Sequence, residues 1–294
     1  MKNDENNNLG IIIQYPGIPL EGDDRFKNLY HFTSFDAFVR IWLSQKLKFG
    51  SMLNVNDIQE SMKGISVSNP SHLPVIFAFQ DMILKYKQIS FTMDADSFLK
   101  GYMNTMMWGY YADKCHGLCI EFDYEKLKIP HHAFMGIVKY TELPPQRANI
   151  PDNVITIKGL REYIENKQES LFFTKQNGWR GENEFRIVCN TLDYLDIKGA
   201  INCVYLTSYD SEECKLVEQL VDDEIEVKYL HYFNGLPVAS EAKNTKEKLE
   251  KIKKGPNVMK QLSDQAKRFY EENKNDENFP LVLNSYTLDN GLKD

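Results

Sequence analysis

The order of the short apolar segments along this chain restricts its possible folds more than any other feature of the sequence. A doubly wound parallel sheet needs strands and helices in regular alternation, because each parallel connection requires a crossover. Here, strand-like segments at residues 117–122 and 134–140 follow one another without a helical pattern between them. The order therefore predicts an α+β fold whose sheet, whole or split, is mainly antiparallel and flanked by helices.

Hydrophobic periodicity indicates where the individual elements lie. Apolar positions at helical spacing indicate helices, and short runs rich in β-branched and aromatic residues indicate strands. The hydroxyl of Thr33 and the carboxylate of Asp36 have the spacing of a capping box, which predicts the start of a helix. We expect strands at residues 29–33, 88–92, 117–122, 134–140, 184–189, 201–206 and 225–233, the last being the final strand, and helices at 35–42, 74–86, 97–112, 155–173 and 212–221.

The composition divides the chain into three parts. Residues 1–27 form an N-terminal tail and lead-in, residues 28–235 hold the α+β domain, and residues 236–294 form a charged, helical C-terminal extension. Within the extension, the apolar residues of segment 258–273 share one face of a helix, and such a face must pack on something. We expect this helix to dock on the domain, with a homodimer contact as the alternative.

The charge balance disfavours some classes of partner. Lys and Arg together number 35 against 42 Asp and Glu, so the formal net charge is −7. Proteins that hold nucleic acid through non-specific phosphate contacts usually carry a basic surplus, so we do not expect nucleic acid as a partner of that kind. The chain has no apolar run long enough to span a membrane and begins without a signal peptide, so we expect a cytoplasmic protein.

We also expect no bound metal. Five cysteines, scattered over the chain, indicate reduced thiols rather than a disulfide framework. Cys115, His116 and Cys119 have the spacing of metal ligands, but a structural zinc site needs a second pair, which the sequence lacks. We interpret the two cysteines as buried thiols beside a turn. The sequence also lacks the P-loop, the dinucleotide-binding glycine motif, the zinc-protease motif and the nucleophile elbow.

Two polar groups near the start of the domain stand in apolar surroundings. His31 lies inside the first expected strand and is either a core histidine bonded to a carbonyl or a ligand-binding residue. Asn56 and Asp57 either form a turn with a helix cap or belong to a site.

Aromatic residues gather at the end of the helix expected over residues 97–112. Trp108, Tyr110 and Tyr111 either pack in the core or present a ring to a ligand, and His116 follows shortly after them. Two adjacent tyrosines on a helix cannot both face inward, and a tyrosine ring is a good platform for a flat ligand.

A row of charged residues occupies the strand expected at 184–189 and the turn before it. Glu182, Glu184 and Arg186 alternate and so share one face, and Lys175 and Trp179 precede them. The row is either a solvated sheet edge or a site that holds an ionised acid beside an arginine.

Taken in order, these segments resemble the DUF2971 family, a broad bacterial family often encoded near mobile elements and anti-phage genes. The resemblance covers about residues 28–210 and leaves out the charged C-terminal segment. It rests on Leu29-Tyr30-His31-Phe32-Thr33-Ser34, Asn56-Asp57 with Glu60, Met107 to Ala112 with His116-Gly117 and Phe122-Asp123, and Lys175, Trp179 and Glu182 to Arg186.

The chain order of a histidine followed by a threonine, a middle tyrosine and a late glutamate is also similar to that of the H-Y-E class of ADP-ribosyltransferases. This resemblance implies an ADP-ribosyltransferase-like fold and NAD as substrate, cleaved between nicotinamide and ribose by a transferase or NADase. It implies that His31 bonds the adenosine-side ribose and that Tyr110 or Tyr111 stacks on nicotinamide. Glu184 or Glu182 would bond the 2′-hydroxyl of the other ribose and stabilise the oxocarbenium-like state. The further residues expected to bind substrate are Thr33, Asn56, Asp57, Trp108, His116, Lys175, Trp179 and Arg186.

Two other functions remain open at this point. A metal-dependent phosphodiesterase or nuclease would use the carboxylates to hold Mg²⁺ and the Lys and Arg side chains to steady a phosphate. A non-catalytic module would bind a nucleotide or a partner protein of a defence system. On the first hypothesis the protein is a toxin or effector in anti-phage defence.

Overall fold

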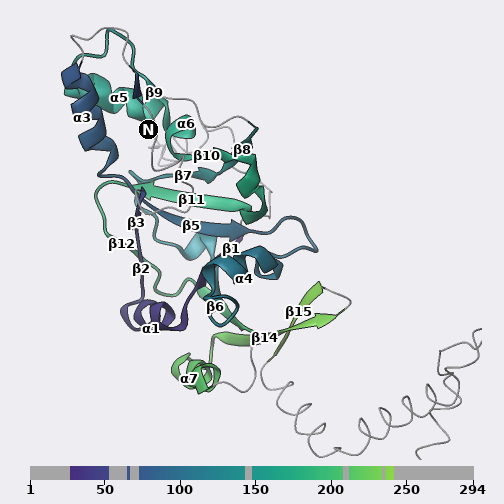
Figure 1. The fold of residues 1–294 in the computed structure, drawn as a ribbon. Helices are drawn as coiled ribbons and strands as arrows, with labels where there is room; N and C mark the ends of the chain where they lie inside the picture. Colours follow the sequence, from purple (N-terminus) through teal and green to yellow (C-terminus); the bar gives the residue numbers. More distant parts are fainter. Residues whose placement is uncertain are drawn as a thin grey trace, which may run out of the picture. The chain divides into compact units, whose positions relative to one another are not determined.

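The structure of the protein is a computed structural model that describes residues 27–52, 65–66, 73–142, 148–207, 212–233 and 236–241 (Figure 1). Contacts between Cα atoms divide the chain into two compact units, Met1–Ser240 and Glu241–Asp294. The N-terminal tail, Asn56, Asp57 and the amphipathic helix predicted for segment 258–273 lie outside the described residues.

One nine-stranded sheet forms the centre of the first unit. Its order is β15-β14-β13-β6-β1-β5-β11-β7, with β3 pairing to β5 as well. The pair β13–β14 is parallel, and the pairs of β1, β5, β6, β7 and β11 with one another are antiparallel. The strands are β1 (Asn28–Thr33), β3 (Gly50–Ser51), β5 (Lys87–Met93), β6 (Leu118–Asp123), β7 (Phe134–Ile137), β11 (Glu184–Cys189), β13 (Ile201–Leu206), β14 (Glu226–Phe233) and β15 (Leu236–Glu241).

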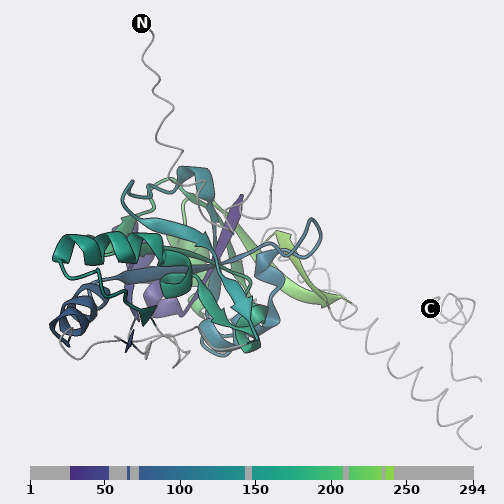
Figure 2. The same cartoon turned by 90° about the horizontal axis from the view of Figure 1, so that it is seen from above.

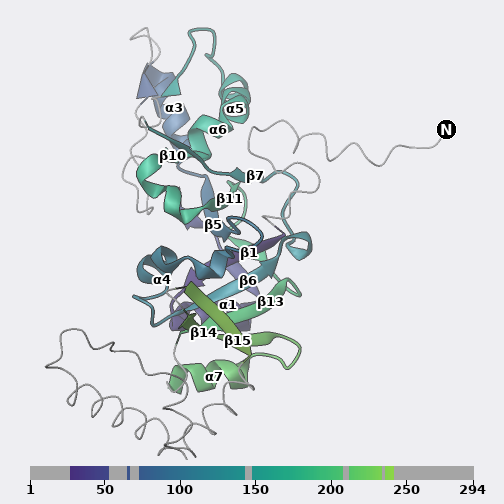
Figure 3. The same cartoon turned by 90° about the vertical axis from the view of Figure 1, so that its right-hand side faces the viewer.

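Helices and short strand pairs surround this sheet. Figure 3 shows α7 near β14, at one end of the strand order, and α3, α5 and α6 near β7 at the other. The helices are α1 (Phe35–Ser44), α3 (Leu73–Ile83), α4 (Thr105–Tyr111), α5 (Ile157–Asn166), α6 (Gln168–Phe172) and α7 (Glu212–Leu220). The short pairs are β2 (Lys46–Lys48) with β12 (Tyr194–Asp196), β8 (Lys139–Thr141) with β10 (Thr174–Gln176), and β4 (Ile65–Ser66) with β9 (Ala148–Asn149). The 3₁₀ turns are Gly101–Met103, Tyr124–Lys126 and Asn177–Glu182.

Two apolar clusters hold the helices in place. In the first cluster, Trp108 of α4 packs edge-on against Phe32 of β1, with ring centroids 5.3 Å apart. The indole N–H of Trp108 donates to the carbonyl of Tyr102. In the other, α3 and α5 lie side by side (Figure 2), and Phe79 meets Tyr163 with ring centroids 6.1 Å apart. Burial of such aromatic side chains is the main contribution that fixes a helix on a sheet.

The pairing of β1 differs between its two neighbouring strands. Along β6, every residue of β1 has a register partner, from Asn28 opposite Asp123 to Thr33 opposite Leu118. Along β5, only Leu29 and Tyr30 are paired, opposite Met93 and Thr92. From His31 onward, β1 and β5 separate, so the middle of the sheet is split.

The predicted α+β class with a mainly antiparallel sheet is confirmed. The strands expected at 29–33, 88–92, 117–122, 184–189 and 201–206 are present, with ends that differ by at most one residue. None of the helices in the described part of the chain combines the length and the apolar character needed to cross a bilayer.

The first helix begins where predicted, at Phe35, but its N-cap is one residue later than the capping-box pattern indicates. Ser34, not Thr33, is the N-cap, and its hydroxyl accepts the backbone N–H of Ala37 at 3.3 Å. Thr33 cannot take that role because it is still the last residue of β1 and pairs with Leu118.

The prediction of one helix over residues 97–112 is also wrong, because only α4 at its end is α-helical. The Asp96 carboxylate accepts two backbone N–H groups that follow it, and this bonding forms a loop instead of a first helical turn. Gly101 lies against the ring of Tyr30, where a Cβ atom would come within 2.2 Å of the ring, and Asn104 caps α4.

Other predicted elements are interrupted or followed by more structure. The segment 134–140 is divided into β7 and β8 at Val138, whose N–H donates to the carbonyl of Glu184. The segment 155–173 is divided into α5 and α6 at Lys167. The strand at 225–233 is not the last, because β15 follows β14 at the edge of the sheet.

Candidate functional site

A pocket of about 340 Å³ opens where β1 and β5 separate. Its walls come from β1, the end of β2, β3, β5, the end of α4, β10, the turn before β11 and the first residue of β11. A volume of this size is within the range that small-molecule sites occupy. Residues far apart in the sequence therefore meet at the split, including His31, Thr92, Tyr111 and Glu182.

Alternating polar residues of β5 form one wall of the pocket. Gln88, Ser90 and Thr92 share one face of this strand because successive side chains point to opposite faces. In the register with β11, Thr92 lies opposite Glu184 and Ser90 lies opposite Arg186, so the polar row continues onto the next strand.

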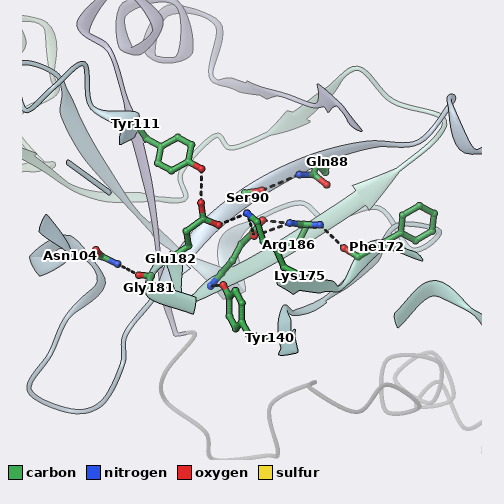
Figure 4. Close-up of polar contacts among 11 residues, drawn as sticks. Gln88, Ser90, Asn104, Tyr111, Tyr140, Phe172, Lys175, Gly181, Glu182 and Arg186 are labelled. Atoms are coloured by element: carbon green, nitrogen blue, oxygen red, sulfur yellow. Dashed lines mark hydrogen bonds and ion pairs between the residues drawn. The ribbon is translucent and has the colours of Figure 1, made fainter. Parts of the chain in front are cut away.

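Glu184 and Arg186 form a buried ion pair next to this wall. The guanidinium donates from Nε and from Nη2 to the two carboxylate oxygens, both at 2.8 Å, and its Nη1 donates to the carbonyl of Phe172 at 2.6 Å (Figure 4). Both side chains are almost completely buried. Although burial opposes the charged form, Arg186 and Lys175 hold the pKa of Glu184 at about 2.

Lys175 connects the two glutamates. Its ammonium lies 2.5 Å from Glu182 Oε2 and 3.5 Å from Glu184 Oε2, and the side chain is 5% exposed. The ammonium also lies 4.9 Å from the centre of the Trp179 ring, within cation–π distance. Two carboxylates and two cations thus share one small volume, and their charges balance.

Glu182 is the member of this group that the end of α4 reaches. The hydroxyl of Tyr111 donates to Glu182 Oε1 at 2.6 Å, so Tyr111 and Lys175 hold one oxygen each (Figure 4). Burial and the neighbouring carboxylate of Glu184 raise the pKa of Glu182, against the effect of Lys175. The turn that carries Glu182 is fixed because the Asn104 side chain donates to the carbonyl of Gly181 at 2.6 Å.

His31 lines the pocket from the β1 side of the split. Its Nδ1 lies 3.2 Å from the carbonyl oxygen of Ser90, which can only accept, so Nδ1 carries the proton. Burial lowers the pKa of His31, and the ring is therefore neutral at pH 7. In that tautomer, Nε2 is an acceptor for a hydroxyl group.

Two buried polar atoms of the pocket wall have no hydrogen-bond partner among the described residues. They are Oε1 of Gln88 and Oγ1 of Thr92, and the Thr92 side chain is only 1% exposed. A buried polar atom without a partner costs stability, and most such atoms in folded proteins are satisfied. Both atoms are on the side of β5 that a bound ligand would contact.

Comparison with known proteins identifies one part of the chain. Residues 107–187 match the family model described as "Protein of unknown function (DUF2971)". The chain contains a DUF2971 domain. No curated protein and no solved structure matches, and the resemblance to ADP-ribosyltransferases has no support from these comparisons.

The match to the DUF2971 model begins in α4 and ends in β11. It therefore includes all the charged residues of the buried group and Tyr111, whereas β1 and β5, which form the other walls, lie before it. The matched range falls inside the wider span expected from the sequence, about residues 28–210.

The structure brings five of the predicted site residues to one pocket and leaves others elsewhere. His31, Tyr111, Lys175, Glu182 and Glu184 line the pocket. Arg186 and Trp179 support it through Glu184 and Lys175 without lining it.

The other predicted site residues lie apart from this pocket. Trp108 packs in the core beneath α4, Tyr110 is 67% exposed, and His116 is exposed in the turn after α4. Thr33 is buried at the end of β1 and does not line the pocket. Tyr111 is thus the tyrosine of the pair that reaches the pocket, because the last turn of α4 points Tyr110 outward.

The cysteines beside this turn are not both buried. Cys115 is exposed and Cys119 is buried, and all five cysteines are free. The turn holds Asp113, Lys114 and Cys115 in the left-handed region, which leaves Cys115 at the surface. The prediction of two buried thiols is therefore wrong for Cys115.

The polar wall formed by β5 was not predicted from the sequence. The sequence does contain a pattern that indicates this wall: polar residues stand at every second position of an otherwise apolar strand, at Gln88, Ser90 and Thr92. Such alternation indicates a strand with one polar face.

The charged group does not have the ligand set of a metal centre. Within the described ranges, no group of three or more His, Cys, Asp and Glu side chains is placed to hold a metal ion. Glu182 and Glu184 are already bonded to Lys175 and Arg186, so a cation would have to displace both. Asp57, which the phosphodiesterase hypothesis also uses, lies outside the described residues.

Proposed function

We propose that the pocket between β1 and β5 binds NAD and that the protein cleaves the bond between nicotinamide and ribose. The observation that carries this proposal is the carboxylate of Glu182, held by Tyr111 and Lys175 in the wall of a pocket that His31 also lines. Gln88 Oε1 and Thr92 Oγ1, which have no hydrogen-bond partner within the described part of the chain, supply further sites for ligand hydroxyl and amide groups.

Cleavage of this bond suits a fixed carboxylate. The bonding electrons leave with nicotinamide, which departs as a neutral ring, and the ribose carbon becomes positively charged. A carboxylate beside that carbon stabilises the charge, and water or another nucleophile then adds and releases a proton. No acid is needed for the leaving group.

Glu182 is better suited than Glu184 to contact the substrate. Both oxygens of Glu184 are held by Arg186, and this pair is part of the folded core. Glu182 has one oxygen bonded to Lys175 and the other bonded to the neutral hydroxyl of Tyr111. We assign Glu182 as the catalytic carboxylate, and Glu184 and Arg186 as the pair that positions Lys175.

His31 and Tyr111 have positioning roles in this proposal. The Nε2 atom of the neutral His31 ring accepts a ribose hydroxyl of NAD. Tyr111 orients Glu182 and contributes its ring to the pocket wall where nicotinamide would lie.

The first test is release of nicotinamide from NAD by purified protein and three variants. We expect Glu182→Gln to reduce the rate by about 10²- to 10³-fold, as loss of a group that stabilises transition-state charge does. It should also lower Tm, because Lys175 loses its nearest buried partner, so the rates are compared at a temperature at which every variant is folded. The exposed Glu162→Gln on α5 is the matched control and should retain full activity. Glu184→Gln should lower Tm, because it leaves Arg186 buried without its partner.

Several outcomes would contradict the proposal. Folded wild-type protein that gives no nicotinamide and no thermal shift with millimolar NAD would remove it, as would full activity in Glu182→Gln. Phosphodiesterase activity that EDTA abolishes would favour the metal-dependent alternative. A thermal shift with NAD but no turnover would favour a nucleotide-binding module.

The cellular setting can be tested with the same variants. On the proposal, the protein is a toxin or effector of anti-phage defence that depletes NAD or modifies a target. Expression of the wild type should then slow bacterial growth, and expression of Glu182→Gln should not.

A further inference from the structure

A second, larger cavity lies on the other side of the turn that carries Glu182. Its volume is about 590 Å³, and its walls come from the loop before α4, the β7–β8 junction and the turn at residues 180–183. Arg180, Gly181 and Asn183 line this second cavity, whereas Glu182 lines the first pocket. Thr92 lines both.

The second cavity combines an apolar interior with cations. Met93 and Val138 are buried in its wall, and the ring of Tyr140 adds a flat surface. Among the described residues, the charged side chains in the lining are Lys100 and Arg180, and none is acidic. Such a lining favours a ligand with a flat ring and an anionic group.

Arg180 is the cation available to such a ligand. Its side chain is exposed and forms no ion pair within the part of the chain that the structure describes. Lys100 is different, because it lies 2.8 Å from Asp94, a carboxylate that is 4% exposed and also accepts the N–H of Gly101. Asp94 holds the Lys100 ammonium in place and offsets part of its charge.

The rigid turn links the two cavities. Asn183 has a left-handed backbone, and its side chain donates to the carbonyl of Met93 at 2.9 Å. Asn104 holds Gly181 from the α4 side, so residues 180–183 are fixed at both ends. Arg180 and Glu182 therefore belong to the same fixed turn, with Arg180 at the second cavity and Glu182 at the first pocket.

We propose that the second cavity is a binding site for a nucleoside monophosphate group, with the base against Tyr140 and the phosphate at Arg180. Two ligands could supply a nucleoside monophosphate group of this chemistry. One is a dinucleotide that extends from the first pocket and places its adenylate end here, and the other is a separate nucleotide. The proposal concerns binding alone and does not depend on cleavage of NAD.

The test is titration calorimetry of the full chain with AMP. We expect saturable binding that Arg180→Ala weakens about tenfold or more, because a phosphate loses its charge-assisted hydrogen bonds. Arg161→Ala, which removes an exposed arginine of α5, should leave the affinity unchanged.

A second titration identifies the source of the group. AMP is added to the Glu182→Gln protein already saturated with NAD. Loss of AMP binding assigns the cavity to the adenylate end of the dinucleotide, and retained binding assigns it to a separate nucleotide.

Two results would overturn the inference. One is the absence of AMP binding to folded wild-type protein at millimolar concentration. The other is binding that Arg180→Ala leaves intact and His31→Ala removes, which would place AMP in the first pocket. Nicotinamide release with no AMP binding would reject the second site alone, and AMP binding without nicotinamide release would reject the proposed cleavage alone.

Discussion

The two sides of β1 differ in how they are held, although they belong to one strand. Toward β6, β1 is paired along its whole length, and the facing residues Cys119, Ile120 and Phe122 are fully buried. Toward β5, pairing stops at Tyr30, and the facing strand carries a polar row. Where β1 and β5 separate, this polar row faces the pocket instead of an apolar neighbouring strand.

The comparison shows that two kinds of interaction stabilise one sheet. On the β6 side, stability comes from apolar burial and from ladder hydrogen bonds. Beyond the split, the buried charges of Glu184 and Arg186 take the place of apolar contacts, and each depends on the other. Substitutions of Glu184 and Arg186 should therefore respond to charge, pH and ligand, and substitutions of the apolar residues Ile120 and Phe122 on β6 should not.

The largest effect is expected when one charge of the buried group is removed. Arg186→Met keeps the length of the side chain but leaves Glu184 without its main partner in a site that excludes water. We expect a loss of about 3–5 kcal/mol in the free energy of unfolding, measured with urea. Arg161→Met on the exposed face of α5 is the control and should change it by less than about 0.5 kcal/mol.

If Arg186→Met proves as stable as the wild type, the split half of the sheet does not depend on its ion pairs. The contrast between the two sides of β1 would then be one of geometry alone.

A pH dependence of intermediate size should come from Glu184. Its pKa in the folded protein is about 2, below the ordinary value of 4.5. A carboxyl group with a lowered folded-state pKa contributes stability that is present above its unfolded pKa and is lost as the pH falls toward the folded value. The contribution of Glu184 should thus be complete above about pH 5 and should decline from there toward pH 2.

This dependence is measured best without Glu182, whose raised pKa acts in the opposite direction. Urea unfolding of Glu182→Gln is compared with that of the Glu182→Gln/Glu184→Gln double variant at a series of pH values. The difference between them should shrink as the pH is lowered. A difference that is constant between pH 3 and pH 7 would show that Glu184 is not held ionised by its neighbours.

The strands were predictable because their signal is local. The alternation in residues 184–189 and 201–206 places β11 and β13 to the residue. The helix over 97–112 was not predictable from periodicity, because Asp96 and the contact of Gly101 with Tyr30 override it. The second of these contacts joins residues that are distant in sequence and depends on the finished fold.

The sequence was enough to predict which residues belong to the site, but it was not enough to predict how they contact one another. His31, Tyr111 and Glu182 stand out as polar groups in apolar segments, and the structure gathers them in one pocket. The choice between Glu182 and Glu184 depends on the contacts of Arg186 and Tyr111, and the Tyr111 contact spans 71 positions of the chain. Periodicity reports which side chains share a face and carries no information on such contacts.

The smallest expected effect tests whether the pocket wall is adapted to a ligand. Thr92→Val replaces a buried hydroxyl that has no partner among the described residues with a methyl group of the same shape. We expect the free energy of unfolding without ligand to rise by about 1 kcal/mol, because the cost of an unsatisfied hydroxyl disappears. Thr174→Val is the matched control: its hydroxyl donates to the carbonyl of Glu169 at 2.9 Å, so the same change should lower the free energy by about 1 kcal/mol.

Ligand binding should reverse the sign of the Thr92 effect. If NAD bonds to the hydroxyl, Thr92→Val should weaken NAD binding about fivefold while Thr174→Val leaves it unchanged. A protein that becomes more stable and binds less well shows that the hydroxyl is kept for its ligand, since the fold alone is better without it. If Thr92→Val lowers stability instead, the hydroxyl has a partner within the protein, and the polar row on β5 belongs to the structure of the sheet.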